Sequence, residues 1–204
     1  MAFIATIEQA RSSRRANQQT AVSLFFVGGV FGVGKSTLCE ALRTPLNAEH
    51  LKASDLIHFT PEQHDPTRKA VSDIEESQRR LVRAFSSHNR TKPNTVLDGH
   101  YCLVDTNQRI SPVPITIFQT LNPAALLLVE AEPSVILERL HRRPGRPYSP
   151  DLVEQLIFEE RHSAMQVSAT LDVPLKSWSS GTPIESVIAF FDSSLARTQF
   201  LKPL

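Results

Sequence analysis

Hydrophobic positions along the chain form two unbroken runs and several stretches with helical spacing. Residues 24–27 read LFFV and residues 124–129 read AALLLV. Unbroken apolar runs of this length are typical of parallel strands that are buried on both faces. Residues 67–87, by contrast, repeat apolar side chains every three or four positions, which predicts an amphipathic helix. The whole pattern predicts strands at residues 21–28, 50–53, 95–97, 124–129 and 173–178.

Proline, glycine and polar residues separate these segments. Residues 59–66 and 104–114 are expected to be irregular, and Ser149 or Asp151 is expected to cap a following helix. Because strands and helices alternate, we expect an α/β fold of the three-layer α/β/α type, in which helices cover both faces of a five-stranded parallel sheet. The predicted helices are residues 35–43, 67–87, 115–121, 133–142, 151–169 and 184–198.

A phosphate-binding motif follows the first predicted strand. Residues 29–36 read GVFGVGKS and match the P-loop pattern G-x-x-x-x-G-K-[ST]. Glycines let backbone N–H groups converge on phosphate oxygens, and the next helix directs its positive end at the same phosphates. Lys35 is expected to reach the β- and γ-phosphates, Ser36 to bind Mg²⁺ and Thr37 to reach the α-phosphate. The predicted site for ATP and Mg²⁺ consists of Gly29, Val30, Phe31, Gly32, Val33, Gly34, Lys35, Ser36 and Thr37.

An acid at the end of a neighbouring strand is expected to position the metal. Asp98 follows the strand at residues 95–97, and ligands of parallel sheets gather at the carboxyl ends of strands. Asp98 is therefore the predicted metal-shell residue, directly or through water. His100 is expected to contact an acceptor or to order the Asp98 loop, with a structural role as the alternative. Asp55, after the second strand, is a candidate for acceptor binding or for helix capping.

Arginines cluster around a turn that is rich in proline and glycine. The guanidinium groups of arginines stabilise the charge that develops on a migrating phosphoryl group. A short flap can bring these groups to the phosphates when it closes. Residues 142–150 are therefore predicted to form a lid, with Arg161 on the next helix facing it. A solvated helix end, where the helix dipole favours arginine, is the alternative. The candidate catalytic arginines are Arg139, Arg142, Arg143 and Arg146.

Composition and charge exclude several classes of function. The formal net charge is +1, so nucleic-acid binding is not expected. No apolar run approaches the roughly 20 residues that span a bilayer, so no membrane partner is expected. Cys39 and Cys102 have no metal-ligand spacing, which predicts buried free thiols in the cytoplasm. Residues 1–20 are expected to form an extension before a single domain at residues 21–204. The sequence does not indicate whether the protein is a monomer or an oligomer.

Several segments together resemble the adenylate-kinase-like nucleoside monophosphate kinases, and within them the archaeal type. The resemblance runs from about residue 22 to residue 191. It implies acceptor-binding helices at about residues 54–90, with Arg68 and Gln78 on positions that contact the monophosphate. The segments that carry it are GGVFGVGKST, the strand end Asp98-Gly99-His100, LNPAALLLVEA, ERLHRRPGRPYSP and VEQLIFEERHSAM.

The sequence therefore predicts a P-loop kinase that transfers the γ-phosphoryl group of ATP to a nucleoside monophosphate. Two alternatives stay open. The first is a kinase of another small acceptor, such as a sugar, a cofactor precursor or a nucleoside. The second is a regulatory P-loop ATPase that binds a partner protein, which the N-terminal extension favours. A kinase of polynucleotide 5′ ends is disfavoured by the near-neutral charge.

Overall fold

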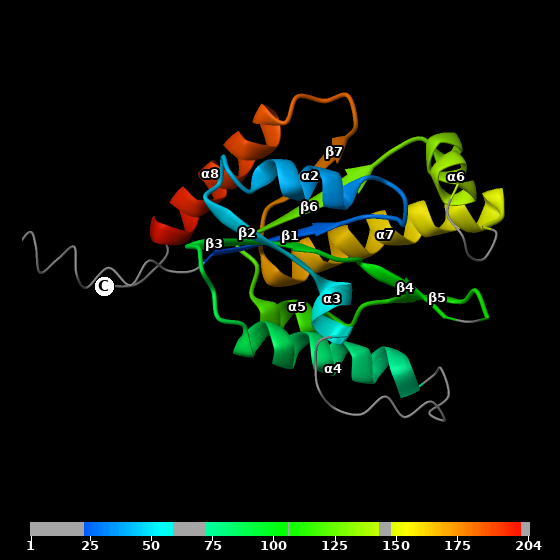
Figure 1. The fold of residues 1–204 in the computed structure, drawn as a ribbon, viewed down its shortest axis with the longest axis horizontal. Helices are drawn as coiled ribbons and strands as arrows, with labels where there is room; N and C mark the ends of the chain where they lie inside the picture. The colour runs from blue at the N-terminus through cyan, green and yellow to red at the C-terminus, as the bar shows by residue number, and fades with distance from the viewer. Residues whose placement is uncertain (1–22, 59–71, 106, 143–147, 201–204) are drawn as a thin grey trace, which may run out of the picture.

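Five parallel strands form the central sheet of the computed structural model (Figure 1). The structure describes residues 23–58, 72–105, 107–142 and 148–200, without the side chains of residues 72–75 and 198–200. The predicted α/β class and the five-stranded parallel sheet are confirmed. Across the sheet the strands lie in the order β2 (Ala48–Lys52), β3 (Asn94–Asp98), β1 (Ser23–Gly28), β6 (Ala125–Glu130) and β7 (Leu175–Ser179).

Helices cover both faces of this sheet (Figure 1). One face carries α2 (Lys35–Leu42), α6 (Pro133–His141) and α8 (Glu185–Phe200). The opposite face carries α3 (Ala53–His58), α4 (Ser72–Ser87) and α5 (Ile115–Leu121). The long helix α7 (Pro150–Leu171) contributes side chains to the cores on both faces.

The two cores explain why the central strands are apolar along their whole length. Phe25 of β1 stacks on Phe191 of α8, with 4.3 Å between ring centroids. The next residue, Phe26, points to the other face and meets Phe118 of α5 at 5.0 Å between ring centroids. Alternate side chains of a strand point to opposite faces, so a strand that is buried on both sides needs apolar residues at every position.

The strand register brings the candidate chemistry to one edge of the sheet. Val27 of β1 and Lys52 of β2 both pair with Asp98, which ends β3 between them. Gly28 of β1 pairs with Leu128 of β6 on the other side. The chain passes from β1 directly into the predicted phosphate loop, so this loop and Asp98 lie at the same carboxyl edge. Ligands of such sheets bind at this edge.

One local prediction is wrong. Residues 104–114 were expected to be irregular, but β4 (Cys102–Val104) and β5 (Ile110–Pro112) pair as an antiparallel hairpin. The strands have three residues each, too few for an alternating pattern to be visible in the sequence. The turn is held by Asp105, whose carboxylate accepts hydrogen bonds from the backbone N–H groups of Asn107 and Arg109. The short helix α3 follows β2 directly and overlaps the start of residues 54–90, where the resemblance implied helices.

Other predictions of local structure are resolved by the described residues. Ser149, not Asp151, caps α7: its Oγ accepts a hydrogen bond from the backbone N–H of Leu152 at 3.2 Å. Cys39 and Cys102 are free and buried, as predicted. None of the helices within the described ranges has the length and apolar character that a bilayer span requires. The predicted extension at residues 1–20 and residues 143–147 of the predicted lid lie outside the described residues.

Candidate functional site

The phosphate loop links β1 to α2 and has the backbone conformation that its glycines permit. Gly29, Gly32 and Gly34 have positive φ angles of 145°, 80° and 109°. Glycine is the residue that adopts this region without strain. At Gly29 a side chain is also excluded by space, because a Cβ atom would lie 2.4 Å from the carbonyl oxygen of Val129. The motif therefore forms a curved loop that ends at the N-terminus of a helix, where backbone N–H groups can face an anion.

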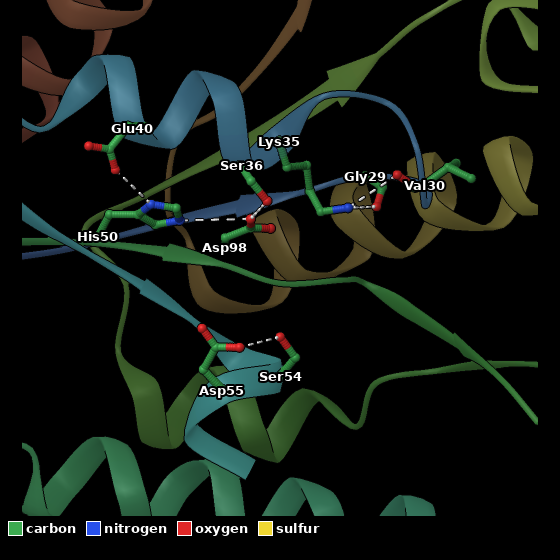
Figure 2. Close-up of polar contacts among 9 residues, drawn as sticks. All are labelled: Gly29, Val30, Lys35, Ser36, Glu40, His50, Ser54, Asp55 and Asp98. Carbon is green, nitrogen blue, oxygen red and sulfur yellow. Dashed lines mark hydrogen bonds and ion pairs between the residues drawn. The ribbon is translucent and has the colours of Figure 1, made fainter. Parts of the chain in front are cut away.

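Lys35 lies across the inside of this loop. Its Nζ donates hydrogen bonds to the carbonyl oxygens of Gly29 at 2.7 Å and Val30 at 3.1 Å (Figure 2). The side chain is buried, with 7% exposed. The ammonium group is thus held by carbonyl groups of the backbone that would surround the phosphates.

Ser36 and Asp98 meet beside Lys35. The Oγ of Ser36 donates a hydrogen bond to Oδ2 of Asp98 at 2.6 Å (Figure 2). Burial by itself would raise the pKa of Asp98, but contacts with His50 and Ser36 and the charge of Lys35 outweigh it and hold this pKa below the usual range. Asp98 is therefore ionised at neutral pH. A hydroxyl and a carboxylate are hard oxygen ligands, so the pair fits Mg²⁺.

The two candidate arginines that the structure describes, Arg139 and Arg142, make different contacts. Arg139 of α6 donates hydrogen bonds to the carbonyl oxygens of Gly32 at 3.2 Å and Val33 at 2.9 Å, so it holds the outer side of the phosphate loop. Arg142 is exposed and pairs with Glu138 at 2.5 Å. Arg143 and Arg146 lie outside the described residues. Thus, of the arginines that the structure describes in this cluster, Arg139 contacts the loop itself.

Arg161 joins two elements of the described fold, and the prediction that it faces the lid is not tested, because residues 143–147 lie outside the described residues. Its guanidinium group donates two hydrogen bonds to Oε1 of Glu130, at 2.9 and 2.6 Å. Glu130 ends β6 at the carboxyl edge of the sheet. The pair therefore connects α7 to this edge.

A cavity of about 450 Å³ adjoins the phosphate loop on the side of α3, α4 and α5. Near the loop its lining is polar, with Lys35, Ser36, Asp98 and Lys52. Further away its walls are apolar. These apolar walls are formed mostly by Phe26, Ile57, Leu81, Leu103, Val113, Ile117, Phe118 and Leu121.

The predicted acceptor residues are placed differently with respect to this cavity. Gln78 of α4 and His100 line it. Asp55 is exposed, does not line it and accepts a hydrogen bond from Ser54 at 3.3 Å. Arg68 lies outside the described residues. The roles of all four in acceptor binding stay predictions.

His100 is held by aromatic and acidic neighbours that the sequence did not identify. Its ring lies 4.1 Å from that of Phe31, between centroids, and its Nδ1 lies 3.1 Å from Oε1 of Glu160. The same carboxylate accepts a hydrogen bond from the backbone N–H of Tyr101 at 2.9 Å. Burial lowers the pKa of His100, and the charge of Lys35 lowers it further, although Glu160 opposes both. His100 is therefore a neutral group that connects the end of β3 to α7.

A second cavity, of about 670 Å³, adjoins the other side of the phosphate loop. No sequence pattern indicated this cavity, and Trp178 lies in its wall. The indole of Trp178 is only partly buried and donates a hydrogen bond to the carbonyl oxygen of Thr182 at 3.1 Å. Both cavities share three residues of the loop region, Gly32, Gly34 and Thr37. The loop thus separates two compartments.

Comparisons with known proteins agree with this arrangement. A curated relative, the adenylate kinase of Pyrococcus abyssi, is 26% identical over 160 residues, which cover 74% of this chain and 80% of that protein. Among solved structures, a gluconokinase from Sinorhizobium meliloti has a TM-score of 0.52 at 16% identity, covering 87% of this chain and 94% of its own. The shikimate kinase of Aquifex aeolicus has a TM-score of 0.54 at 15% identity, covering 86% of this chain and 98% of its own.

The two solved structures are too distant in sequence to indicate more than the fold that they share with this chain. A sequence family gives a firmer assignment. Residues 28–156, more than half of the chain, match the model of the AAA domain family. The chain therefore belongs to the AAA domain family, as a P-loop protein of the kinase type.

Proposed function

We propose that the protein transfers the γ-phosphoryl group of ATP to a small acceptor, and that this acceptor is a nucleoside monophosphate. The observation that carries the proposal is the pair of cavities on opposite sides of one phosphate loop. A triphosphate on the loop would place its γ-phosphate beside Lys35, Ser36 and Asp98, which face the 450 Å³ cavity. An ATPase needs room for a water molecule at this point, whereas a kinase needs room for a second substrate.

The residues of the loop would bind and orient the donor. Its backbone N–H groups and Lys35 would hold the β- and γ-phosphates, with Arg139 keeping the loop in shape. Ser36 and Asp98 would hold the Mg²⁺ that accompanies ATP, and the charge of this ion lowers the repulsion between the phosphates and an incoming oxygen. Positioning and electrostatic stabilisation supply most of the catalysis in this class of reaction.

The walls of the acceptor cavity favour a substrate with a flat, weakly polar part. A nucleobase can lie against apolar residues such as Leu81 and Phe118, and the amide of Gln78 can hydrogen-bond to it. Lys52, at the polar end, can meet a phosphate group. A polyhydroxylated acid such as gluconate or shikimate would leave many hydroxyl groups against apolar walls without hydrogen-bond partners, which is costly.

A transfer assay tests the proposal. The protein is incubated with Mg·ATP and, separately, AMP, CMP, UMP, GMP and the deoxynucleoside monophosphates, and products are separated by anion-exchange chromatography. We expect one of these acceptors to become a diphosphate, with Lys35→Ala as the control against contaminating kinases. Gluconate and shikimate are assayed in parallel. Transfer to either of them, or phosphate release without transfer to any acceptor, would contradict the nucleoside monophosphate assignment.

A further inference from the structure

Three side chains that can bind metals converge behind the phosphate loop. Cys39 comes from α2, His50 from β2 and Asp98 from the end of β3. One ligand atom from each, a sulfur, an imidazole nitrogen and a carboxylate oxygen, lies within 4.8 Å of the other two. All three side chains are buried: Cys39 is fully inaccessible, His50 has 7% of its side chain exposed and Asp98 has 8%. The kinase function proposed above has no use for Cys39 or His50.

The orientation of His50 indicates what the cluster binds. Its Nδ1 faces the carboxylate of Glu40 at 3.6 Å, and its Nε2 faces Oδ2 of Asp98 at 3.8 Å (Figure 2). Nε2 is buried and has no hydrogen-bond partner, because the distance to Asp98 exceeds that of a hydrogen bond. A buried polar nitrogen without a partner is rare in folded proteins and needs an explanation.

The neighbours of the imidazole supply that explanation. Carboxylates lie beside both ring nitrogens, Glu40 beside Nδ1 and Asp98 beside Nε2. In the tautomer that carries its proton on Nδ1, the lone pair of Nε2 points toward Asp98. Two lone pairs that face each other repel, unless a cation lies between them. Histidines that bind metals through one ring nitrogen commonly direct the other N–H at a carboxylate, as His50 does with Glu40.

We propose that Cys39, His50 and Asp98 bind one borderline-soft divalent transition metal ion of the Zn²⁺ or Co²⁺ kind. Sulfur, imidazole nitrogen and carboxylate oxygen are the ligands that Zn²⁺ takes in proteins. Bond lengths of about 2.0–2.3 Å in a tetrahedral site separate the ligand atoms by about 3.3–3.6 Å. The separation of 3.8 Å between His50 and Asp98 is close to this range, and the three ligand atoms, which lie within 4.8 Å of one another, would move together by about 1 Å or less on binding. Coordination releases the thiol proton of Cys39 to solvent and leaves the fourth position open.

This site shares a ligand with the phosphate loop. Oδ2 of Asp98 accepts the hydrogen bond from Ser36 and also faces His50. On the proposed function, Asp98 belongs to the shell of the Mg²⁺ that accompanies ATP. A transition metal on Cys39 and His50 therefore competes for this carboxylate, so that each of the two metals weakens the binding of the other. The cluster is thus an inhibitory metal site that lies directly behind the catalytic one.

Cobalt titration of the full chain, without Mg²⁺ or nucleotide, tests the site. We expect one equivalent of Co²⁺ to produce visible d–d bands together with a near-ultraviolet band from thiolate-to-metal charge transfer. The chain has two cysteines, so single variants assign this band. Cys39→Ser should remove it and the matched control Cys102→Ser should retain it. Glu40→Gln should weaken Co²⁺ binding about tenfold by removing the carboxylate that orients His50.

Several results would overturn the proposal. One is the absence of the charge-transfer band, and another is its survival in Cys39→Ser. Thermal unfolding of each variant shows whether it folds. If Cys39→Ser does not fold, X-ray absorption of the cobalt-loaded natural chain serves instead, where one sulfur ligand supports the site and none refutes it. These readouts do not depend on kinase activity, so failure of the kinase proposal would not be mistaken for failure of the site.

A second titration tests the competition. With saturating Mg·ATP, the affinity for Co²⁺ should fall about tenfold or more, because the two ions require the same carboxylate. An unchanged affinity would refute the inhibitory role of the site.

Discussion

The phosphate loop and the 450 Å³ cavity beside it are built in opposite ways, although they share residues. The loop is a continuous segment whose shape depends on three positive-φ glycines and whose contacts with Lys35 and Arg139 go to backbone carbonyl groups. The cavity is lined by side chains from β1, α3, α4, α5 and the hairpin β4–β5. A site made of local backbone can be identified from a short motif, whereas a site made of distant side chains depends on the whole fold. The chemistry of the protein is therefore readable from its sequence, and its acceptor is not.

The largest effect is expected on the loop side of this comparison. Lys35→Ala removes the cation that lies inside the loop, and we expect kcat/KM for phosphoryl transfer to fall at least about 100-fold. Lys92→Ala is the matched control, because Lys92 is exposed and its side chain bonds to Asn47 far from the loop. Steady-state kinetics with Mg·ATP would measure both variants. Turnover that survives in Lys35→Ala would refute the assignment of the loop as the catalytic site.

Arg139→Ala separates the shape of the loop from its chemistry. The substitution removes two hydrogen bonds to the carbonyl groups of Gly32 and Val33. We expect the affinity for Mg·ATP to fall roughly tenfold, since the loop is then less well ordered for binding. Calorimetric titration measures this, with the exposed Arg197 changed to alanine as the control. If ATP affinity were unchanged while turnover fell, Arg139 would act on the migrating phosphoryl group and not through the loop.

A smaller effect is expected on the cavity side. Gln78→Ala removes an amide from the wall of the 450 Å³ cavity, on the helix α4 and not on the phosphate loop. We expect KM for the acceptor to rise about three- to tenfold, the cost of one neutral hydrogen bond, with KM for ATP unchanged. A change in KM for ATP instead would mean that the two sites are not separable. Gln155→Ala on α7, outside the cavity lining, is the matched control.

The smallest effect is expected on the stability of the fold at high pH, through a buried thiol beside the cavity. Burial raises the pKa of Cys102 to about 11, although its contact with Ser163 opposes this. In the unfolded chain the thiol ionises near its ordinary pKa of about 8.5. The contribution of this thiol to the free energy of unfolding is thus fully present below about pH 8.5. It is lost as the pH rises towards 11, because the thiol then ionises in the unfolded chain but not in the folded one. Urea unfolding at pH 8 and pH 10 should show a smaller loss of stability in Cys102→Ser than in the natural chain. An equal loss in both proteins would contradict the buried, neutral thiol.

The fold was predictable because its central strands are apolar at every position and its helices are periodic. The runs around Phe25 and Leu127 can only be satisfied by a sheet that is covered on both faces. The position of Asp98 beside the phosphate loop was also accessible to sequence reasoning, because parallel strands end at one edge. The hairpin β4–β5 was not, since three-residue strands carry no recognisable period.

The contacts around the site show where sequence reasoning stops. Glu160 lies in the middle of α7, and its burial beside His100 and Tyr101 follows from how α7 packs on the end of β3. Cys39 and His50 carry no metal-ligand spacing, because they come from a helix and from an adjoining strand. Arg139 was expected to act from a moving lid, but the packing of α6 places it on the loop. In each case the partner is distant in sequence and is selected by tertiary packing.

The hairpin β4–β5 has a consequence for engineering this enzyme. It contributes Leu103 to the cavity wall, and Val113 follows it directly, yet neither residue is part of the phosphate loop. Its turn is held by hydrogen bonds from nearby backbone N–H groups to the side chain of Asp105. A hairpin of different length or composition can therefore be grafted there with little disturbance to the sheet. Libraries that vary this short segment offer a direct route to new acceptors while phosphoryl transfer is preserved.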